Sequence, residues 1–270
     1  MDVAIPPPPY RLLRTLRRGH AASVVEATGA KGVPVVVKLA NPAAHGADSL
    51  GAKRFEREIA LSAALRHPGL ARVLGHGDGW IAFEHLDAPL SDEGVRKRHA
   101  PPGAARLLLA RLAATLAHLH AQGVVHRDVK PAHVMFRADV PVLIDLGVAG
   151  LVADDPLEGT EFVGSPAWMA PEQMDGAAPD EAADIWSLCA IGLWLAAGRA
   201  LHEGSADDVL AARRGGRGPD PAAMPIPVAD PLLASILRAG LGPAQDRPRA
   251  AAIALALAGP DQAMMRSTAG

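Results

Sequence analysis

The sequence predicts an α+β fold, in which a small β-rich lobe with one helix precedes a larger, mainly helical lobe. Two observations predict the first lobe: short β-branched runs alternate with Gly-containing turns, and only one segment among them has helical spacing. A third observation separates the lobes, because the composition shifts after Asp87 to helical patterns joined by Pro- and Gly-rich loops. With 270 residues, 49% of them hydrophobic, the chain is large enough to bury a sizeable core.

The first lobe is expected at residues 10 to 86, after a Pro-rich leader at residues 1 to 9. The runs SVVEA and VPVVVKLA, separated by TGAKG, predict two antiparallel strands joined by a turn. Residues 52 to 66 have helical spacing that places Glu58 on one stripe with Leu61 and Leu65, and HPG ends this helix. ARVLGHGDG and WIAFEHL predict two further strands.

The second lobe is expected at residues 87 to 262, followed by a short tail at residues 263 to 270. It begins with a long amphipathic helix, PGAARLLLARLAATLAHLHAQG, which ends at Gly123. Two short apolar stretches, VVH and PVLID, are expected to pair as a hairpin. Most of the remaining chain is predicted to alternate helices with loops, without an internal repeat.

Composition narrows the location and the partners of the protein. The formal net charge of −2 and pI near 6.6 give no electrostatic reason to expect a nucleic acid or an anionic membrane as partner. A single cysteine, Cys189, excludes an intramolecular disulfide and fits a reducing compartment. The most apolar stretch, residues 185 to 197, is too short to span a bilayer, and the N-terminus lacks a signal-peptide pattern. We therefore expect a cytoplasmic protein without a membrane segment. Its excess of Arg over Lys favours a bacterial source.

A set of charged residues indicates phosphate chemistry. Lys38 ends a predicted strand and Glu58 follows on the predicted helix; a lysine that faces a nucleotide needs such an anionic anchor. HRDVKP places Asp128 in a loop with Lys130 two residues later, and IDLG presents Asp145 before a Gly-containing turn. These two loop carboxylates suit different tasks: Asp128 would accept a hydroxyl proton, and Asp145 would bind a cation that carries phosphate oxygens.

In this order, and with GSPAWMAPE, DIWSL and DRP after them, these residues resemble the eukaryotic-type (Hanks-type) Ser/Thr protein kinase family. The resemblance covers residues 10 to 258. It implies the bilobal protein-kinase-like fold and a kinase that uses ATP with Mg²⁺ or Mn²⁺. It assigns Lys38 and Glu58 to the strand–helix ion pair, Asp128 to the catalytic loop, and Asp145 to the metal-binding DFG motif, here DLG. It also implies that Glu172 of MAPE pairs with Arg247 and that Asp184 braces the catalytic loop.

The resemblance narrows the substrate to a protein Ser or Thr. Lys130, two residues after Asp128, is typical of Ser/Thr kinases, and Ser165 stands where they usually carry a threonine that faces the acceptor. Small-molecule phosphotransferases usually lack the GSPAWMAPE segment. Arg127 would bind a phosphate on the activation segment. Thr160 is the candidate for that phosphate if Ser165 keeps its substrate-facing role, and an unmodified Thr160 is the alternative.

The nucleotide-binding residues follow the family pattern only in part. Phe83 would be the gatekeeper, and the backbone from Glu84 to Leu86 would bind adenine. The glycine-rich loop reads RRGHAASV, which keeps Gly19 and Val24 as nucleotide contacts but has Arg17 at the first glycine position and alanine at the third. Because glycine lets the backbone approach phosphate closely, these changes are expected to loosen or reshape the cover over the nucleotide.

A second departure is His133, which replaces the asparagine that holds the second metal in this family. Mg²⁺ prefers oxygen ligands, whereas imidazole nitrogen suits Mn²⁺ and Zn²⁺, so His133 is expected to weaken or alter that site. Two hypotheses remain: an active kinase with atypical metal use, and a pseudokinase that binds nucleotide or acts as a scaffold. Transfer to a small molecule is a third, less favoured alternative. The sequence leaves room for a regulatory partner protein but identifies none.

Overall fold

A computed structural model shows the expected α+β architecture and divides the chain into two compact units. The first unit comprises Met1–Asp87 with Ile144–Gly147, and the second comprises Ala88–Leu143 with Val148–Gly270. The structure describes residues 7, 9–19, 22–41, 50–151, 165–175, 178, 180–198, 200–201, 208–209 and 226–267.

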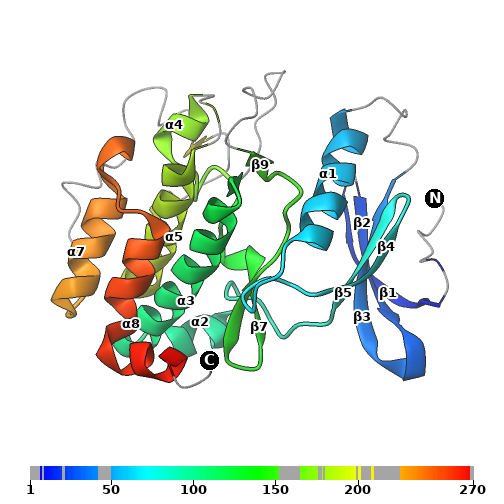
Figure 1. The fold of residues 1–270 in the computed structure, drawn as a ribbon, viewed down its shortest axis with the longest axis horizontal. Coiled ribbons are helices and arrows are strands. Elements are labelled where there is room, and N and C mark those ends of the chain that lie inside the picture. The colour runs from blue at the N-terminus through cyan, green and yellow to red at the C-terminus, as the bar shows by residue number, and fades with distance from the viewer. Residues whose placement is uncertain are drawn as a thin grey trace. The chain divides into compact units, whose positions relative to one another are not determined.

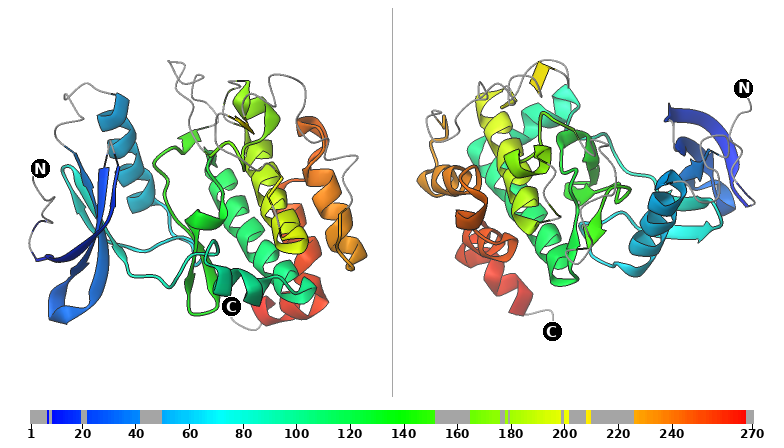
Figure 2. Two further views of the ribbon diagram at one scale, coloured as in Figure 1. Left: turned by 180° about the vertical axis from the view of Figure 1, so that it is seen from behind. Right: turned by 90° about the horizontal axis from the view of Figure 1, so that it is seen from above.

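The first unit is built on an antiparallel sheet, with five strands among its described residues in the order β1-β2-β3-β5-β4. Strands β2 and β3 alternate buried and partly exposed residues, so Val25, Val35, Val37 and Leu39 fill a core against which Tyr10 and Trp80 pack. Helix α1 lies beside the sheet in each of the views drawn (Figures 1 and 2). The elements are β1 (Arg11–Arg18), β2 (Ala22–Thr28), β3 (Pro34–Ala40), α1 (Leu50–Ala64), β4 (Val73–Gly77) and β5 (Trp80–Glu84).

Strand β1 is not apparent from the sequence. Its residues, RLLRTLRR, lack β-branched alternation, and Leu13 and Leu16 are 56% and 44% exposed. It forms because β2 presents an unpaired edge, and the pairing runs from Arg11 opposite Thr28 to Arg18 opposite Ser23. Tertiary pairing therefore overrides a weak local preference for strand.

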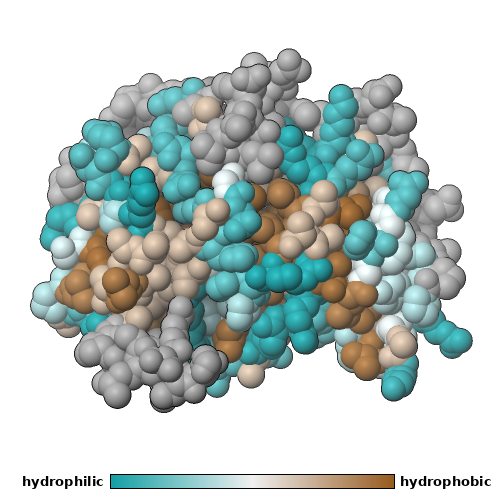
Figure 3. Space-filling view, viewed as in Figure 1, coloured by the Kyte–Doolittle hydropathy of each residue, from teal (hydrophilic) through white to brown (hydrophobic). Residues whose placement is uncertain are grey.

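The second unit is mainly helical. Helix α5 is apolar on all sides and almost wholly buried; it packs against α3 and α7, and α3 also packs along α8. Burial raises the pKa of the Cys189 thiol on α5 to about 12, so this thiol stays protonated. On the face drawn in Figure 3, apolar residues gather over α7 and α8. The helices are α2 (Glu93–His99), α3 (Pro102–Ala121), α4 (Pro171–Met174), α5 (Glu181–Ala197), α7 (Pro231–Gly240) and α8 (Ala250–Ser267).

The hairpin expected between VVH and PVLID does not form, and that prediction was wrong. Instead β7 (Val134–Arg137) pairs with β8 (Val140–Leu143), and β6 (Val124–Val125) pairs with β9 (Gly150–Leu151). The turn between β7 and β8 is only two residues long and uses Ala138 at a φ of 52°, in the left-handed region. Closing a two-residue turn costs less chain entropy than closing a loop across HRDVKPAH, so β8 pairs with its neighbour β7.

Within the described part of the chain, no helix is both long and apolar enough to cross a membrane.

Candidate active site

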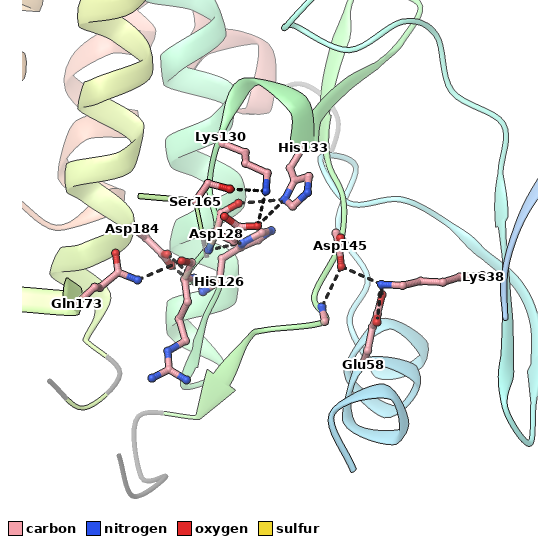
Figure 4. Close-up of polar contacts among 12 residues, drawn as sticks. Lys38, Glu58, His126, Asp128, Lys130, His133, Asp145, Ser165, Gln173 and Asp184 are labelled. Atoms are coloured by element: carbon pink, nitrogen blue, oxygen red, sulfur yellow. Dashed lines mark hydrogen bonds and ion pairs between the residues drawn. The ribbon is translucent and has the colours of Figure 1, made fainter. Parts of the chain in front are cut away.

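Lys38 and Glu58 form a buried ion pair in the first unit (Figure 4). Alternation along β3 turns Val37 and Leu39 into the core, so Lys38 lies on the other face of the sheet. Helix α1 buries one stripe, on which Glu58 is only 2% exposed. The Nζ atom of Lys38 lies 2.7 Å from both carboxylate oxygens of Glu58. This two-oxygen contact fixes the end of a long, flexible side chain.

Asp145 belongs to the same unit and joins this pair. Its Oδ1 accepts hydrogen bonds from Lys38 Nζ at 3.0 Å and from the Gly147 amide at 3.2 Å, and its backbone is left-handed with a φ of 68°. A Cβ on Gly147 would lie 2.9 Å from Asp145 Oδ1 and 2.9 Å from Glu58 Oε2. The glycine of DLG is therefore required for the three charged groups to meet.

Burial and the neighbouring charges shift the pKa values of Lys38 and Glu58. Burial raises the pKa of Glu58 to about 7 against the opposing effect of the Lys38 ammonium, and Asp145 raises it further. Burial also acts to lower the pKa of Lys38, but Glu58 and Asp145 outweigh it and raise that pKa. The Asp145 side chain is 30% exposed and supplies hard carboxylate oxygen, the ligand type that Mg²⁺ and Mn²⁺ prefer. The residues present therefore fit a divalent cation held with phosphate.

Gly19 is the glycine of the glycine-rich loop that the structure describes, and both of its backbone polar groups are bonded. The Gly19 amide donates to the Ala22 carbonyl at 2.9 Å, and the Gly19 carbonyl accepts from Asn41 Nδ2 at 2.7 Å. A Cβ at Gly19 would lie 3.0 Å from the Ala22 oxygen, so the position favours glycine. Arg17, at the position of the first glycine, lies exposed on β1 opposite Val24.

The segment expected to bind adenine lies on and just after β5. The Glu84 carboxylate is 8% exposed and accepts hydrogen bonds from the Arg72 amide at 2.8 Å and from Arg72 Nε at 3.0 Å. Its side chain is thus engaged within the first unit, and its backbone amide donates to the Arg72 carbonyl at 3.0 Å. Leu86 is buried and Phe83 partly so. Their contacts with a nucleotide stay predictions.

The second unit carries the catalytic-loop cluster around Asp128 (Figure 4). The Lys130 ammonium lies 2.7 Å from Asp128 Oδ2 and 2.6 Å from Ser165 Oγ. The other carboxylate oxygen, Oδ1, is buried and has no hydrogen-bond partner among the described residues. One oxygen of Asp128 is thus neutralised by a lysine, while the other retains its full capacity to accept a proton or a hydrogen bond.

Asp184 holds the backbone of this loop from helix α5. Its carboxylate is fully buried and accepts hydrogen bonds from the backbone amides of His126 and Arg127, both at 2.8 Å. His120 Nε2 lies 2.9 Å from Asp184 Oδ2. Arg127 has a φ of 68°, which is costly for a residue with a side chain. The loop therefore takes a strained shape that a buried carboxylate stabilises.

His133 ends the short 3-10 helix Pro131–His133 and is 6% exposed. Its Nδ1 lies 3.0 Å from the backbone carbonyl of Asp128 and 3.4 Å from Asp128 Oδ2. Because a carbonyl oxygen only accepts, the ring must donate a proton from Nδ1. In the neutral ring the lone pair then belongs to Nε2, which is the arrangement found when histidine binds a metal through one nitrogen and a carbonyl through the other.

The end of the predicted activation segment is tied to the helical unit. Both oxygens of Glu172, on α4, pair with the guanidinium of Arg247, with Nη2 at 3.0 Å from Oε2. Arg247 also donates to the Gly242 and Ala182 carbonyls and stacks over the Trp186 ring at 5.0 Å. Thr160 lies outside the described residues.

The comparisons with known proteins agree with this geometry. The family described as protein kinase domain matches residues 10–215. The chain belongs to the protein kinase family. This kinase domain is 32% identical over 78% of its length to the probable serine/threonine-protein kinase PkwA of Thermomonospora curvata. It is 34% identical over 90% of its length to the serine/threonine-protein kinase PkaA of Streptomyces coelicolor, and 30% identical over 86% to PknD of Mycobacterium tuberculosis.

These bacterial relatives are all named serine/threonine-protein kinases. The matched regions cover 29% of PkwA, 46% of PkaA and 36% of PknD, so this kinase spans less than half the length of each.

Sequence reasoning missed one residue that contacts the catalytic loop and one that contacts the Asp184 carboxylate holding it. His120 belongs to none of the motifs singled out in the sequence, yet its Nε2 lies 2.9 Å from Asp184 Oδ2. Gln173 received no interpretation, although its Nε2 donates to the Arg127 carbonyl at 3.0 Å. The position of Gln173 beside Glu172 was the available signal, but a side-chain amide that bonds a backbone carbonyl leaves no pattern in a sequence.

Proposed function

We propose that this kinase domain transfers the γ-phosphoryl group of ATP to a Ser or Thr hydroxyl of a protein substrate. The bond between the γ-phosphorus and its bridging oxygen breaks, a bond from the hydroxyl oxygen to phosphorus forms, and ADP leaves. The hydroxyl proton passes to Asp128. ATP as donor favours a cytoplasmic location, and residues 10–86 and 87–262 would be the two kinase lobes.

The unequal environment of the two Asp128 oxygens carries this proposal. Lys130 engages Oδ2, and Oδ1 is buried without a hydrogen-bond partner among the described residues. A buried acceptor without a partner is costly, so it is rarely retained without a use. A substrate hydroxyl donating to Oδ1 would remove that cost and would align its oxygen for attack on phosphorus.

The first unit supplies the groups that would hold the nucleotide. Lys38, anchored by Glu58, would donate to phosphate oxygens, and Asp145 would bind the divalent cation that neutralises them. The cation would supply charge neutralisation during transfer. The glycine-rich loop that contains Gly19 would cover the phosphates, and the backbone from Glu84 to Leu86 would hold the adenine.

A protein Ser or Thr as acceptor is supported by the contact between Lys130 and Ser165. The Nζ atom of Lys130 lies 2.6 Å from Oγ of Ser165, in the segment that would face the acceptor, and 2.7 Å from Oδ2 of the proposed base Asp128. The relatives named serine/threonine-protein kinases support the same acceptor class. Regulation by phosphate on Thr160, read by Arg127, and by a partner protein remains part of the proposal.

We also infer atypical metal use at His133. With the Nδ1 proton donated to the Asp128 carbonyl, the basic nitrogen of the neutral ring is Nε2. Nitrogen ligands favour Mn²⁺ over Mg²⁺. Activity is therefore expected to be greater with Mn²⁺, and His133→Asn is expected to restore the use of Mg²⁺. An unchanged metal preference in that variant would contradict this role of His133.

The decisive experiment measures phosphate incorporation into the purified protein and into a general protein substrate. The protein is incubated with ATP and either Mg²⁺ or Mn²⁺, and the product is read by intact mass and peptide mapping. Asp128→Asn should abolish incorporation, whereas Asp78→Asn, in the exposed turn between β4 and β5, is the matched control and should not. Incorporation that persists in Asp128→Asn would refute the proposed base.

A pseudokinase is the second candidate, and the substitution at His133 is the observation that favours it. If that substitution has removed catalysis but not binding, ATP should raise the melting temperature of the protein while no phosphate is transferred with either metal. Lys38→Met should then abolish the thermal shift. Transfer with either metal would exclude this alternative.

A further inference from the structure

We propose that Gln173 is a positioning residue that couples the end of the activation segment to the catalytic loop. It lies on α4, directly after Glu172, and its side-chain amide reaches the backbone carbonyl of Arg127 (Figure 4). The inference rests on the proposed function, because Arg127 immediately precedes the proposed base Asp128. It adds a residue that nothing in the sequence motifs assigned.

The point of contact is the most strained backbone of the catalytic loop. Arg127 has a φ of 68°, a conformation that residues with a Cβ rarely adopt. Such a conformation persists only where surrounding groups enforce it. The peptide groups on either side of Arg127 determine where the Asp128 side chain begins, so the base is aimed correctly only while this conformation is held.

Two side chains from different helices hold Arg127 from its two ends. Asp184 of α5 accepts from the Arg127 amide at 2.8 Å, and Gln173 of α4 donates to the Arg127 carbonyl at 3.0 Å. The same Gln173 amide group is itself fixed, because its Oε1 accepts from the Ala170 amide at 3.1 Å. Gln173 thus bridges the loop that carries the base and the segment that would meet the substrate.

The contact between Gln173 and Arg127 depends on how the stretch from Trp168 to Gln173 is attached to the rest of the second unit. Ser187 Oγ of α5 donates to the Trp168 carbonyl at 2.8 Å, and Arg247 pairs with Glu172. These contacts fix both ends of the stretch from Trp168 to Gln173. If the segment leaves α5, the Gln173 amide leaves the Arg127 carbonyl, and one restraint on the catalytic loop is lost. Docking of the segment therefore affects the base directly.

Two variants separate positioning from simple packing. Gln173→Leu removes both hydrogen bonds and should lower kcat roughly five- to tenfold, the effect of one lost hydrogen bond on alignment. The KM for ATP should stay within twofold, because Lys38 and its partners are untouched. Gln173→Glu keeps the acceptor for Ala170 but turns a carboxylate toward the Arg127 carbonyl, so it should lower kcat at least as much. A packing role would make this near-isosteric change the milder one.

A double-mutant cycle tests whether the effect passes through Arg127. Glycine adopts a positive φ without strain, so Arg127→Gly removes the strain that the hydrogen bond from Gln173 helps to hold at this residue. In that background, Gln173→Leu should change kcat by less than twofold. An equal cost in both backgrounds would overturn the proposal, as would a Gln173→Leu enzyme with unaltered kcat.

Hydrogen exchange tests the coupling between Gln173 and the catalytic loop even if the protein transfers no phosphate. In Gln173→Leu, peptides that cover residues 124 to 130 should exchange faster than in the wild type, while α3 should be unchanged. Gln122→Leu, an exposed glutamine at the end of α3, is the matched control. Unchanged exchange in the loop would overturn the coupling. Absence of phosphate transfer by the wild type, with faster exchange in the variant, would refute the proposed function but not the coupling.

Discussion

The two clusters of functional residues are held in different ways. In the first unit, charged side chains hold one another: Lys38 contacts Glu58 and Asp145 at 2.7 to 3.0 Å, and Glu58 is almost fully buried. In the second unit, the loop that carries Asp128 is held mainly through its backbone, by Asp184 and Gln173. The first arrangement depends on charge state, and the second depends on hydrogen-bond geometry.

This difference matches the tasks proposed for the two clusters. Groups that bind phosphate and a cation work through charge, and their flexible side chains need only be anchored at their ends. A base must instead be aimed at one oxygen atom, and small displacements of its backbone move that aim. Changes in charge should therefore affect nucleotide binding, and changes in hydrogen bonding should affect turnover.

The largest effect is expected from Lys38→Met. It leaves the buried carboxylate of Glu58 beside Asp145 without a cation, and removal of one partner of a buried pair costs about 3–5 kcal/mol. The free energy of unfolding should fall by about that amount, and ATP affinity should fall more than a hundredfold. Denaturant titration and calorimetry measure these two quantities.

An exposed pair of equal length is the control for Lys38. Lys97 lies 2.7 Å from Glu93 on α2, with both side chains about two-thirds exposed or more. Lys97→Met should leave the free energy of unfolding unchanged. The double variant Lys38→Met, Glu58→Gln should be more stable than Lys38→Met alone. If it is not, the uncompensated charge is not the cause.

The second prediction addresses the backbone-held cluster through Asp184→Asn. The amide keeps one acceptor oxygen but turns N–H donors toward the amides of His126 or Arg127, and a buried donor left unsatisfied costs about 1–3 kcal/mol. We expect a loss of about 3 kcal/mol in the free energy of unfolding and a fall in kcat with ATP affinity preserved.

Asp180→Asn provides the matched control, because Asp180 caps the same helix by accepting from the Ala182 amide and Asn caps helices equally well. Its stability should match the wild type. A loss of ATP affinity in Asp184→Asn as large as its loss of kcat would show that the two clusters do not act separately.

Part of each cluster could be predicted from the sequence. The pairing of Lys38 with Glu58 was expected because a lysine that faces a nucleotide needs an anionic anchor, and the resemblance implied that Asp184 braces the catalytic loop. The contact of Asp145 with Lys38 was not predicted. The partners of β6 and β8 and the contact of Gln173 depend on which distant backbone groups meet, which no local pattern encodes. Strand β1 was missed for the same reason, since its partner is the edge of β2.

The third prediction uses the ionisation of Glu58. Burial raises its pKa to about 7, so the carboxylate that anchors Lys38 becomes protonated as the pH falls from 8 to 6. ATP affinity should fall about tenfold over this range relative to Glu58→Gln, which lacks the titrating group and corrects for the titration of ATP itself. Equal pH dependence in the two proteins would contradict this assignment.

Stability should change in the opposite direction. Because folding raises the Glu58 pKa from 4.5 to about 7, the folded state binds more protons than the unfolded state between these values. The contribution of Glu58 to stability is therefore fully present below pH 4.5 and is lost as the pH rises toward 7. Denaturant titrations at pH 5 and pH 7, each compared with Glu58→Gln, should show the wild type losing stability relative to the variant.

The smallest effect is expected from Ser165→Ala. It removes the acceptor that lies 2.6 Å from Lys130 Nζ but leaves the bond from Lys130 to Asp128 Oδ2. Lys130 is 18% exposed and can turn toward water, so the cost should be about 1 kcal/mol and kcat should fall only a few-fold. Ser165→Thr keeps the hydroxyl and should be close to the wild type. A loss as large as that of Asp128→Asn would mean that Ser165, rather than the backbone contacts of the loop, aims the base.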